Sequence, residues 1–73
     1  MTQSTRLEVN GQTMTFDAAD FPTTVTKLIE SMGLDRKMVV AEINGELVKR
    51  VDLDSHALTD GDRVELVRFV GGG

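Results

Sequence analysis

Polar and apolar side chains alternate along the first part of the chain, on both sides of a turn signal. Residues 6–9 alternate with a period of two, and so do residues 12–16, as expected of half-buried β-strands. Asn10-Gly11 lies between them and is the dipeptide favoured in tight type I′ turns. The pattern predicts a β-hairpin whose core face is formed by Leu7, Val9, Met14 and Phe16.

A helical period replaces the alternation after a connection at residues 17–22. Apolar residues then recur at i, i+3, i+4 and i+7, which marks one face of an α-helix: Val25, Leu28, Ile29 and Met32. Thr23 or Thr24 can cap the first free backbone N–H groups, and Gly33 suits the left-handed position after the last turn. We therefore expect a helix at residues 24–32 that packs its apolar stripe into the core.

The strand pattern returns after a charged stretch at residues 35–37, which we expect to be a loop. Residues 38–43 are more apolar than the first strands, which predicts a central strand. Asn44-Gly45 is a second hairpin signal, and residues 46–49 are expected to pair back across it.

One irregular segment and one strand complete the predicted order. Residues 51–59 have no clear period and are expected to contain a short helical turn, and after a turn at Asp60-Gly61 the last strand is predicted at residues 63–70. The order ββαββ, irregular segment, β predicts an α+β class β-grasp fold, as in ubiquitin: a mixed sheet with one main helix on one face. The first and last strands would be parallel neighbours in its middle. We expect residues 1–69 to form a single domain and residues 70–73 a flexible glycine tail.

Composition argues against several classes of function. The 73 residues include no cysteine, which excludes disulfides and thiol nucleophiles, and a single histidine cannot build a zinc cluster. No run approaches the roughly 18 apolar residues of a membrane-spanning helix, and no signal-like segment begins the chain, so we expect a cytoplasmic protein without membrane contact. The net charge of −4 and the lack of a basic run argue against nucleic-acid binding and favour basic partner surfaces.

The acidic residues near the end of the chain do not have the spacing of a calcium loop. A hand-type calcium loop needs a glycine at its sixth position and a glutamate at its twelfth. Counting from Asp52, these positions hold Ala57 and Arg63. His56 has no second histidine or nucleophile beside it in sequence, and Ser55 lacks a nucleophile-elbow context. We therefore expect no metal site, no bound cofactor and no self-contained enzyme. The carboxylates considered as calcium ligands are Asp52, Asp54, Asp60 and Asp62.

The last predicted strand runs directly into Val70-Gly71-Gly72-Gly73. Glycine has no Cβ, so such a tail could thread a channel too narrow for other residues, and an inert terminus is the alternative. We expect the chain to end at Gly73 on a free carboxylate, which is ionised at neutral pH. A carboxylate reacts only after activation, typically as an acyl-adenylate made from ATP. The tail would then be the substrate of a partner enzyme.

Alternation along the last strand predicts a docking surface beside the tail. If Val64 and Leu66 lie under the helix, then Val67 and Phe69 lie on the open face of the sheet. Exposed apolar residues at such a place favour partner docking, joined by Val40 from the neighbouring strand and by Val70. The alternative is that the alternation shifts at the strand end and Phe69 closes the core.

Several blocks together resemble one protein family over nearly the whole chain. They are AEINGELV at 41–48, LTDGDRVEL at 58–66, VGGG at 70–73 and the helix segment at 24–34. The chain resembles the ThiS branch of the ThiS/MoaD ubiquitin-like sulfur carriers.

The resemblance implies a role in thiamine biosynthesis. An E1-like adenylyltransferase of the ThiF type would use ATP to adenylate Gly73, and a persulfide protein would supply sulfur for a terminal thiocarboxylate. A thiazole synthase of the ThiG type would receive the sulfur. Carried over by position, Gly73 is the modified residue, Gly72 its required partner in the channel, and Gly71 matches members that end in three glycines.

Three alternatives remain open. Related carriers deliver sulfur to molybdopterin, cysteine, homocysteine or tRNA, and the fold does not name the acceptor. The blocks at 43–45 and 60–65 also resemble TGS domains, which are regulatory binding modules within longer chains. A protein modifier joined through Gly73 to a lysine would share the first step. One departure is that Lys49-Arg50-Val51 lacks a proline found near there in some members.

Overall fold

The computed structural model describes residues 4–69, and they begin with the predicted hairpin. Strand β1 (Ser4–Val9) pairs antiparallel with β2 (Gln12–Asp17). Asn10 and Gly11 have φ values of 50° and 81°, the left-handed pair that a type I′ turn requires. Leu7 and Val9 are buried, while Met14 and Phe16 on the edge strand are half-buried against the core, so the predicted hairpin is confirmed.

The predicted helix is confirmed to within one residue at each end, as α1 (Val25–Ser31). The Thr24 side-chain oxygen accepts a hydrogen bond from the Lys27 N–H at 3.2 Å, so Thr24 is the cap. At the other end, the N–H of Gly33, with φ 74°, donates to the Glu30 carbonyl and the N–H of Leu34 donates to the Ile29 carbonyl. This pair of bonds is a Schellman motif, which terminates the helix.

The charged stretch after the helix is not the loop that the sequence predicts. Residues 36–38 form a 3-10 turn, η2 (Arg36–Met38), because the Asp35 carboxylate accepts a hydrogen bond from the Lys37 N–H at 2.9 Å. Strand β3 (Val39–Ile43) therefore begins one residue later than predicted.

The rest of the described chain follows the predicted order. Asn44 and Gly45 form the second left-handed turn, with φ values of 52° and 88°, and lead into β4 (Glu46–Val48). The expected helical turn is η3 (Arg50–Asp52), and another 3-10 turn, η1 (Ala18–Asp20), lies in the connection between hairpin and helix. The last strand is β5 (Arg63–Arg68).

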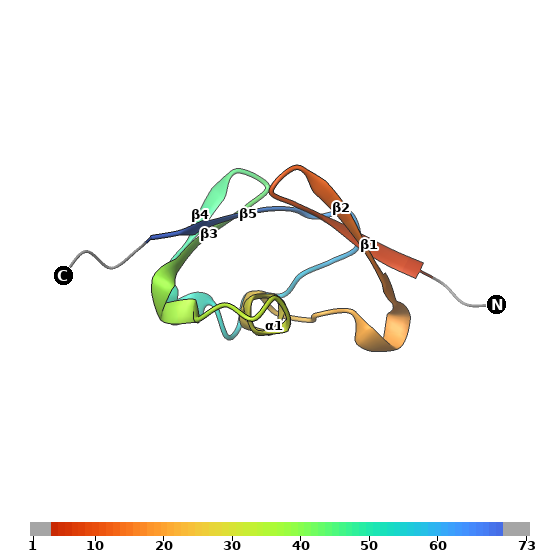
Figure 1. Cartoon of the computed structure of the whole chain (residues 1–73), viewed down its shortest axis with the longest axis horizontal. Helices are drawn as coiled ribbons and strands as arrows, with labels where there is room; N and C mark the ends of the chain where they lie inside the picture. The colour runs from red at the N-terminus through yellow and green to blue at the C-terminus, as the bar shows by residue number, and fades with distance from the viewer. Residues whose placement is uncertain (1–3, 70–73) are drawn as a thin grey trace.

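The five strands form one mixed sheet in the order β2-β1-β5-β3-β4. Strands β1 and β5 are parallel neighbours in its interior, as predicted, and the other pairs are antiparallel. The sheet arches over α1, which lies against its concave face (Figure 1). This is the predicted β-grasp arrangement, and no helix among the described residues is long and apolar enough to cross a membrane.

The core lies between α1 and the concave face of the sheet. Burial of a leucine there stabilises the fold by roughly 1.5–3 kcal/mol, and Leu7 and Leu28 are fully buried. Among residues 4–69 no polar or charged side chain is buried, so the core is purely apolar. Its members are Leu7, Val9, Val25, Leu28, Ile29, Val39, Ala41, Ile43, Val48, Leu53, Leu58, Val64 and Leu66.

Candidate functional site

Strand β5 is an interior strand of the sheet, and the last residues of the chain follow it. It lies between β1 and β3: β1 pairs with its first two residues, and β3 pairs with it from Val64 to Arg68. The pairing continues past the strand, because the Phe69 N–H donates to the Met38 carbonyl at 3.1 Å. The chain is thus anchored up to Phe69. The predicted site residues Val70, Gly71, Gly72 and Gly73 lie outside the described residues.

Three apolar side chains are exposed beside this last anchored position. Val40 and Val67 are directly opposite each other across β3 and β5, and they are 37% and 59% exposed. Phe69 is 40% exposed and does not belong to the buried core. The alternative that Phe69 closes the core is therefore wrong. We call Val40, Val67 and Phe69 the open-face patch.

Sequence reasoning missed a further exposed apolar residue on the same sheet. Leu47 in β4 is 65% exposed and lies opposite Glu42 of β3. The signal was present, because Val48 is buried and alternation puts its neighbour Leu47 on the other face. Glu42 in turn lies opposite Glu65 of β5, so two carboxylates separate the open-face patch from the hairpin ends of the sheet.

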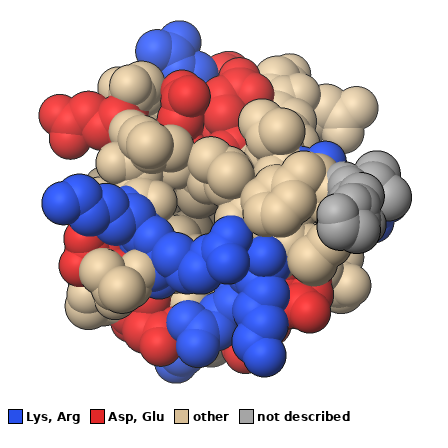
Figure 2. Space-filling model, turned by 90° about the vertical axis from the view of Figure 1, so that its left-hand side faces the viewer, with Lys and Arg blue, Asp and Glu red and all other residues tan. Residues whose placement is uncertain are grey.

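Basic side chains gather at the end of the molecule where β5 ends. The Arg50 guanidinium carbon lies 6.0 Å from the centre of the Phe69 ring, at the outer limit of a cation–π contact. Figure 2 shows this end of the molecule, where several Lys and Arg side chains lie together beside uncharged residues, with Asp and Glu side chains around them. The sequence showed no basic run, because these residues come from separate segments.

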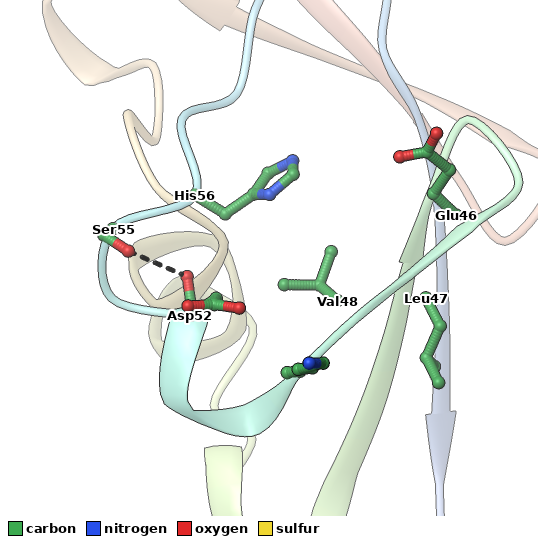
Figure 3. A pocket seen from close by; sticks show the side chains of 7 residues that line it. Glu46, Leu47, Val48, Asp52, Ser55 and His56 are labelled. Carbon is green, nitrogen blue, oxygen red and sulfur yellow. Dashed lines mark hydrogen bonds between the residues drawn. The ribbon is translucent and has the colours of Figure 1, made fainter.

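The residues around His56 do not form a catalytic arrangement. An open pocket lies between β4 and the segment after η3, with Val48 between the side chains of Glu46 and His56 (Figure 3). The Ser55 hydroxyl donates to the Asp52 backbone carbonyl at 3.3 Å, so it is turned away from the His56 ring. Among residues 4–69, no group of three His, Asp or Glu side chains is placed to hold a metal.

The carboxylates weighed as a calcium site serve separate structural purposes. Asp54 accepts hydrogen bonds from Thr26 and Arg36, whereas Asp60 accepts from the Arg6 N–H at 2.7 Å. Asp62 accepts from the Thr59 N–H at 2.9 Å and from the Asn44 amide at 3.0 Å. Burial raises the pKa of Asp62, but these hydrogen bonds outweigh it and hold the pKa below its ordinary value.

Comparison with known proteins gives a consistent match. Residues 5–73 match the model of the ThiS family. The chain is 37% identical over 68 residues to a thiazole synthase of Paramagnetospirillum magneticum, covering 93% of this chain and 20% of that protein. It is 38% identical over 50 residues to the sulfur carrier protein ThiS of Bacillus subtilis, covering 68% of this chain and 76% of that one. The chain thus spans about a fifth of the length of the thiazole synthase and most of the length of the carrier.

Two solved structures from Geobacter metallireducens have the same fold. The crystal structure of its thiamine biosynthesis protein ThiS superposes with a TM-score of 0.76 at 38% identity, covering 93% of this chain and 99% of that one. An NMR structure of a thiamine biosynthesis protein from this organism gives a TM-score of 0.75 at 38% identity, covering 93% and 87%.

Proposed function

This chain belongs to the ThiS family, and from that premise we propose that it is a sulfur carrier protein whose Gly73 carboxylate becomes a thiocarboxylate. One observation supports this most directly. The family match runs to Gly73, so it includes the glycines as well as the fold. The carrier is acted on by partner enzymes and performs no catalysis itself.

The chemistry requires three balanced steps. A carboxylate oxygen of Gly73 attacks the α-phosphorus of ATP, and pyrophosphate leaves. The terminal sulfur of a protein persulfide then attacks the acyl carbon, and AMP leaves. A thiol finally cleaves the sulfur–sulfur bond, which frees the thiocarboxylate and forms a disulfide with the donor. The sulfur therefore travels on the carboxyl terminus, and the carrier needs no cysteine of its own.

The three glycines are suited to the first step. Without a Cβ, Gly71 and Gly72 could pass a channel that excludes larger residues and place the Gly73 carboxylate beside ATP in the activating enzyme. ATP would be bound by the E1-like enzyme, so the carrier would hold no cofactor. Since this chemistry consumes ATP, a persulfide and a reducing thiol, the carrier would work in the cytoplasm.

The acceptor that we propose is a thiazole synthase. The support is that a stretch similar to this chain makes up a fifth of a protein named thiazole synthase. The open-face patch would dock the carrier on its partners, because it lies beside the last anchored residue before the tail.

ATP–pyrophosphate exchange with the E1-like enzyme from the same cells tests the first step. We expect the full chain to support exchange, and the chain lacking Gly73 to support none. A matched control is Val51→Ala, because Val51 is exposed and lies outside the open-face patch. Exchange that persists without Gly73 would contradict the proposal.

A further inference from the structure

Three segments bring basic residues to the end of the sheet where β5 ends. In the antiparallel register, Val39 at the start of β3 lies opposite Arg68 at the end of β5, and Ala41 lies opposite Val48 at the end of β4. The start of β3 and the ends of β4 and β5 therefore lie at the same end of the sheet. Lys37 precedes β3, Lys49 and Arg50 follow β4, and Arg68 ends β5. We call Lys37, Lys49, Arg50 and Arg68 the basic cluster.

Two members of the basic cluster, Lys49 and Arg50, lie close to the last described residues of the chain. Lys49 and Arg50 line the same shallow groove as Val39 and Val40. Arg50 also lies over the ring of Phe69, the last described residue before the tail. Several Lys and Arg side chains lie together at this end of the molecule, beside uncharged residues (Figure 2). Lys49 and Arg50 therefore border the open-face patch, and Lys37 and Arg68 lie at the same end of the sheet.

No member of the basic cluster forms an ion pair within the part of the chain that the structure describes. The one ion pair there joins Arg36 to Asp54 at 3.2 Å, and it involves no member of the basic cluster. All four members are exposed. The nearest acidic residues in sequence are Asp35 and Asp52: Asp35 caps η2, and neither forms an ion pair with the cluster.

Charge is therefore separated along this acidic molecule. The chain has eight Lys and Arg against twelve Asp and Glu, and half of the cations belong to the basic cluster. The net charge predicts a basic partner surface, whereas the end of the sheet where β5 ends gathers four of the eight cations. A partner that takes the tail meets this end, so local charge decides the contact.

We propose that the basic cluster docks against an acidic protein surface around the entrance through which the activating enzyme takes the tail. This inference rests on the proposed function. A protein surface fits better than a nucleic acid, because the exposed apolar patch beside the cluster matches the mixed composition of protein interfaces. A duplex carries one phosphate charge per ~1.7 Å of its axis, which would oppose the acidic remainder of the molecule.

Charges at the rim of an interface act mainly on the association rate. They orient the approaching proteins over a screening length of about 8 Å at physiological salt, and they change dissociation less. The basic cluster would therefore speed the encounter with the activating enzyme, while the chemical step at Gly73 would not depend on it.

The test compares charge reversals inside and outside the basic cluster. Lys49→Glu and Arg68→Glu change the charge by the same amount as the control Lys27→Glu, which lies on the exposed face of α1. Stopped-flow association with the purified E1-like enzyme is measured at about 50 mM and about 300 mM salt. Lys49 lies outside every strand, so its variant tests the inference even if Arg68→Glu weakens the sheet.

We expect each cluster variant to slow association about fivefold at low salt, with little difference from the parent at high salt. The control variant should associate as the parent does, and the adenylation rate at saturating carrier should be unchanged in all variants. Association rates that are equal for cluster and control variants, or independent of salt, would overturn the inference while normal adenylation keeps the proposed function. A parent chain that is never adenylated would overturn both. Binding of a labelled RNA hairpin, lost in Lys49→Glu, would overturn the inference in favour of a nucleic-acid partner.

Discussion

Replacing Phe69 by alanine separates docking from folding. Truncation of a fully buried phenylalanine costs about 3–5 kcal/mol, but Phe69 is 40% exposed and lies outside the buried core. Its cation–π contact with Arg50, at 6.0 Å, adds about 0.5–1 kcal/mol at an exposed site. We therefore expect Phe69→Ala to lower the free energy of unfolding by about 1 kcal/mol, which shifts the Tm of a domain this small by about 4–8 °C.

Phe69→Ala should weaken binding to the activating enzyme more than it lowers the free energy of unfolding. An aromatic residue at the centre of an interface loses about 2 kcal/mol or more on truncation, which is roughly a thirtyfold weaker Kd. The Kd for the activating enzyme is measured by titration calorimetry well below the melting range, and the Tm is measured by circular dichroism in a separate thermal scan. Val51→Ala, at an 84% exposed site, should change neither, and Leu66→Ala, at an 8% exposed core site, should cost stability instead.

An unchanged Kd for Phe69→Ala would remove the open-face patch from the account of docking. A loss of stability comparable to that of Leu66→Ala would show that Phe69 is a core residue, contrary to its exposure.

Three further outcomes are expected. Gly72→Leu should abolish adenylation with a Tm within about 1 °C of the parent, since a glycine has no side chain to bury in a core, and a large drop in Tm would mean that the tail is structural. Thr24→Ala should cost about 1 kcal/mol by urea titration because the bond to the Lys27 N–H is lost, whereas Thr24→Ser should retain most of it; equal losses would refute the capping role. Asp62 has a lowered pKa in the folded state, so its ionised form stabilises the fold above the unfolded pKa of about 3.9, and this contribution is lost as pH falls through the lower folded value. Asp62→Asn should therefore be less stable than the parent at pH 7, and the gap should close on acidification; a gap that is constant with pH would contradict the cause given.

The fold was predictable because local signals agreed with one another. The two Asn-Gly turns both adopt left-handed φ values, and the spacing of Val25, Leu28 and Ile29 matches the buried face of α1. The parallel pairing of β1 with β5 joins residues far apart in sequence, and it followed only from the order of elements. The charged residues at 35–37 predict a loop, but the Asp35 carboxylate caps a 3-10 turn at residues 36–38, which hydrophobic periodicity does not reveal.

The candidate site was less predictable than the fold. Val40 and Val67 followed from alternation, because burial alternates along β3 and along β5 as far as Val67. The basic cluster did not, since it depends on the register of three strand ends and on short turns that no local pattern specifies. The net charge of −4 does not show this arrangement, because it sums over the whole chain.

The central claim is that Gly73 carries sulfur, and intact mass measures this most directly. The gene for thiazole synthase is deleted from the native cells so that the sulfur-loaded carrier accumulates. The cells are lysed in an alkylating reagent, which traps a thiocarboxylate, and the chain is then purified. The account predicts one alkyl group on a terminus in which sulfur has replaced one oxygen, mapped by fragmentation to Gly73. A terminus that remains an unmodified carboxylate under these conditions, or larger adducts in which Gly73 is joined to lysine, would contradict it.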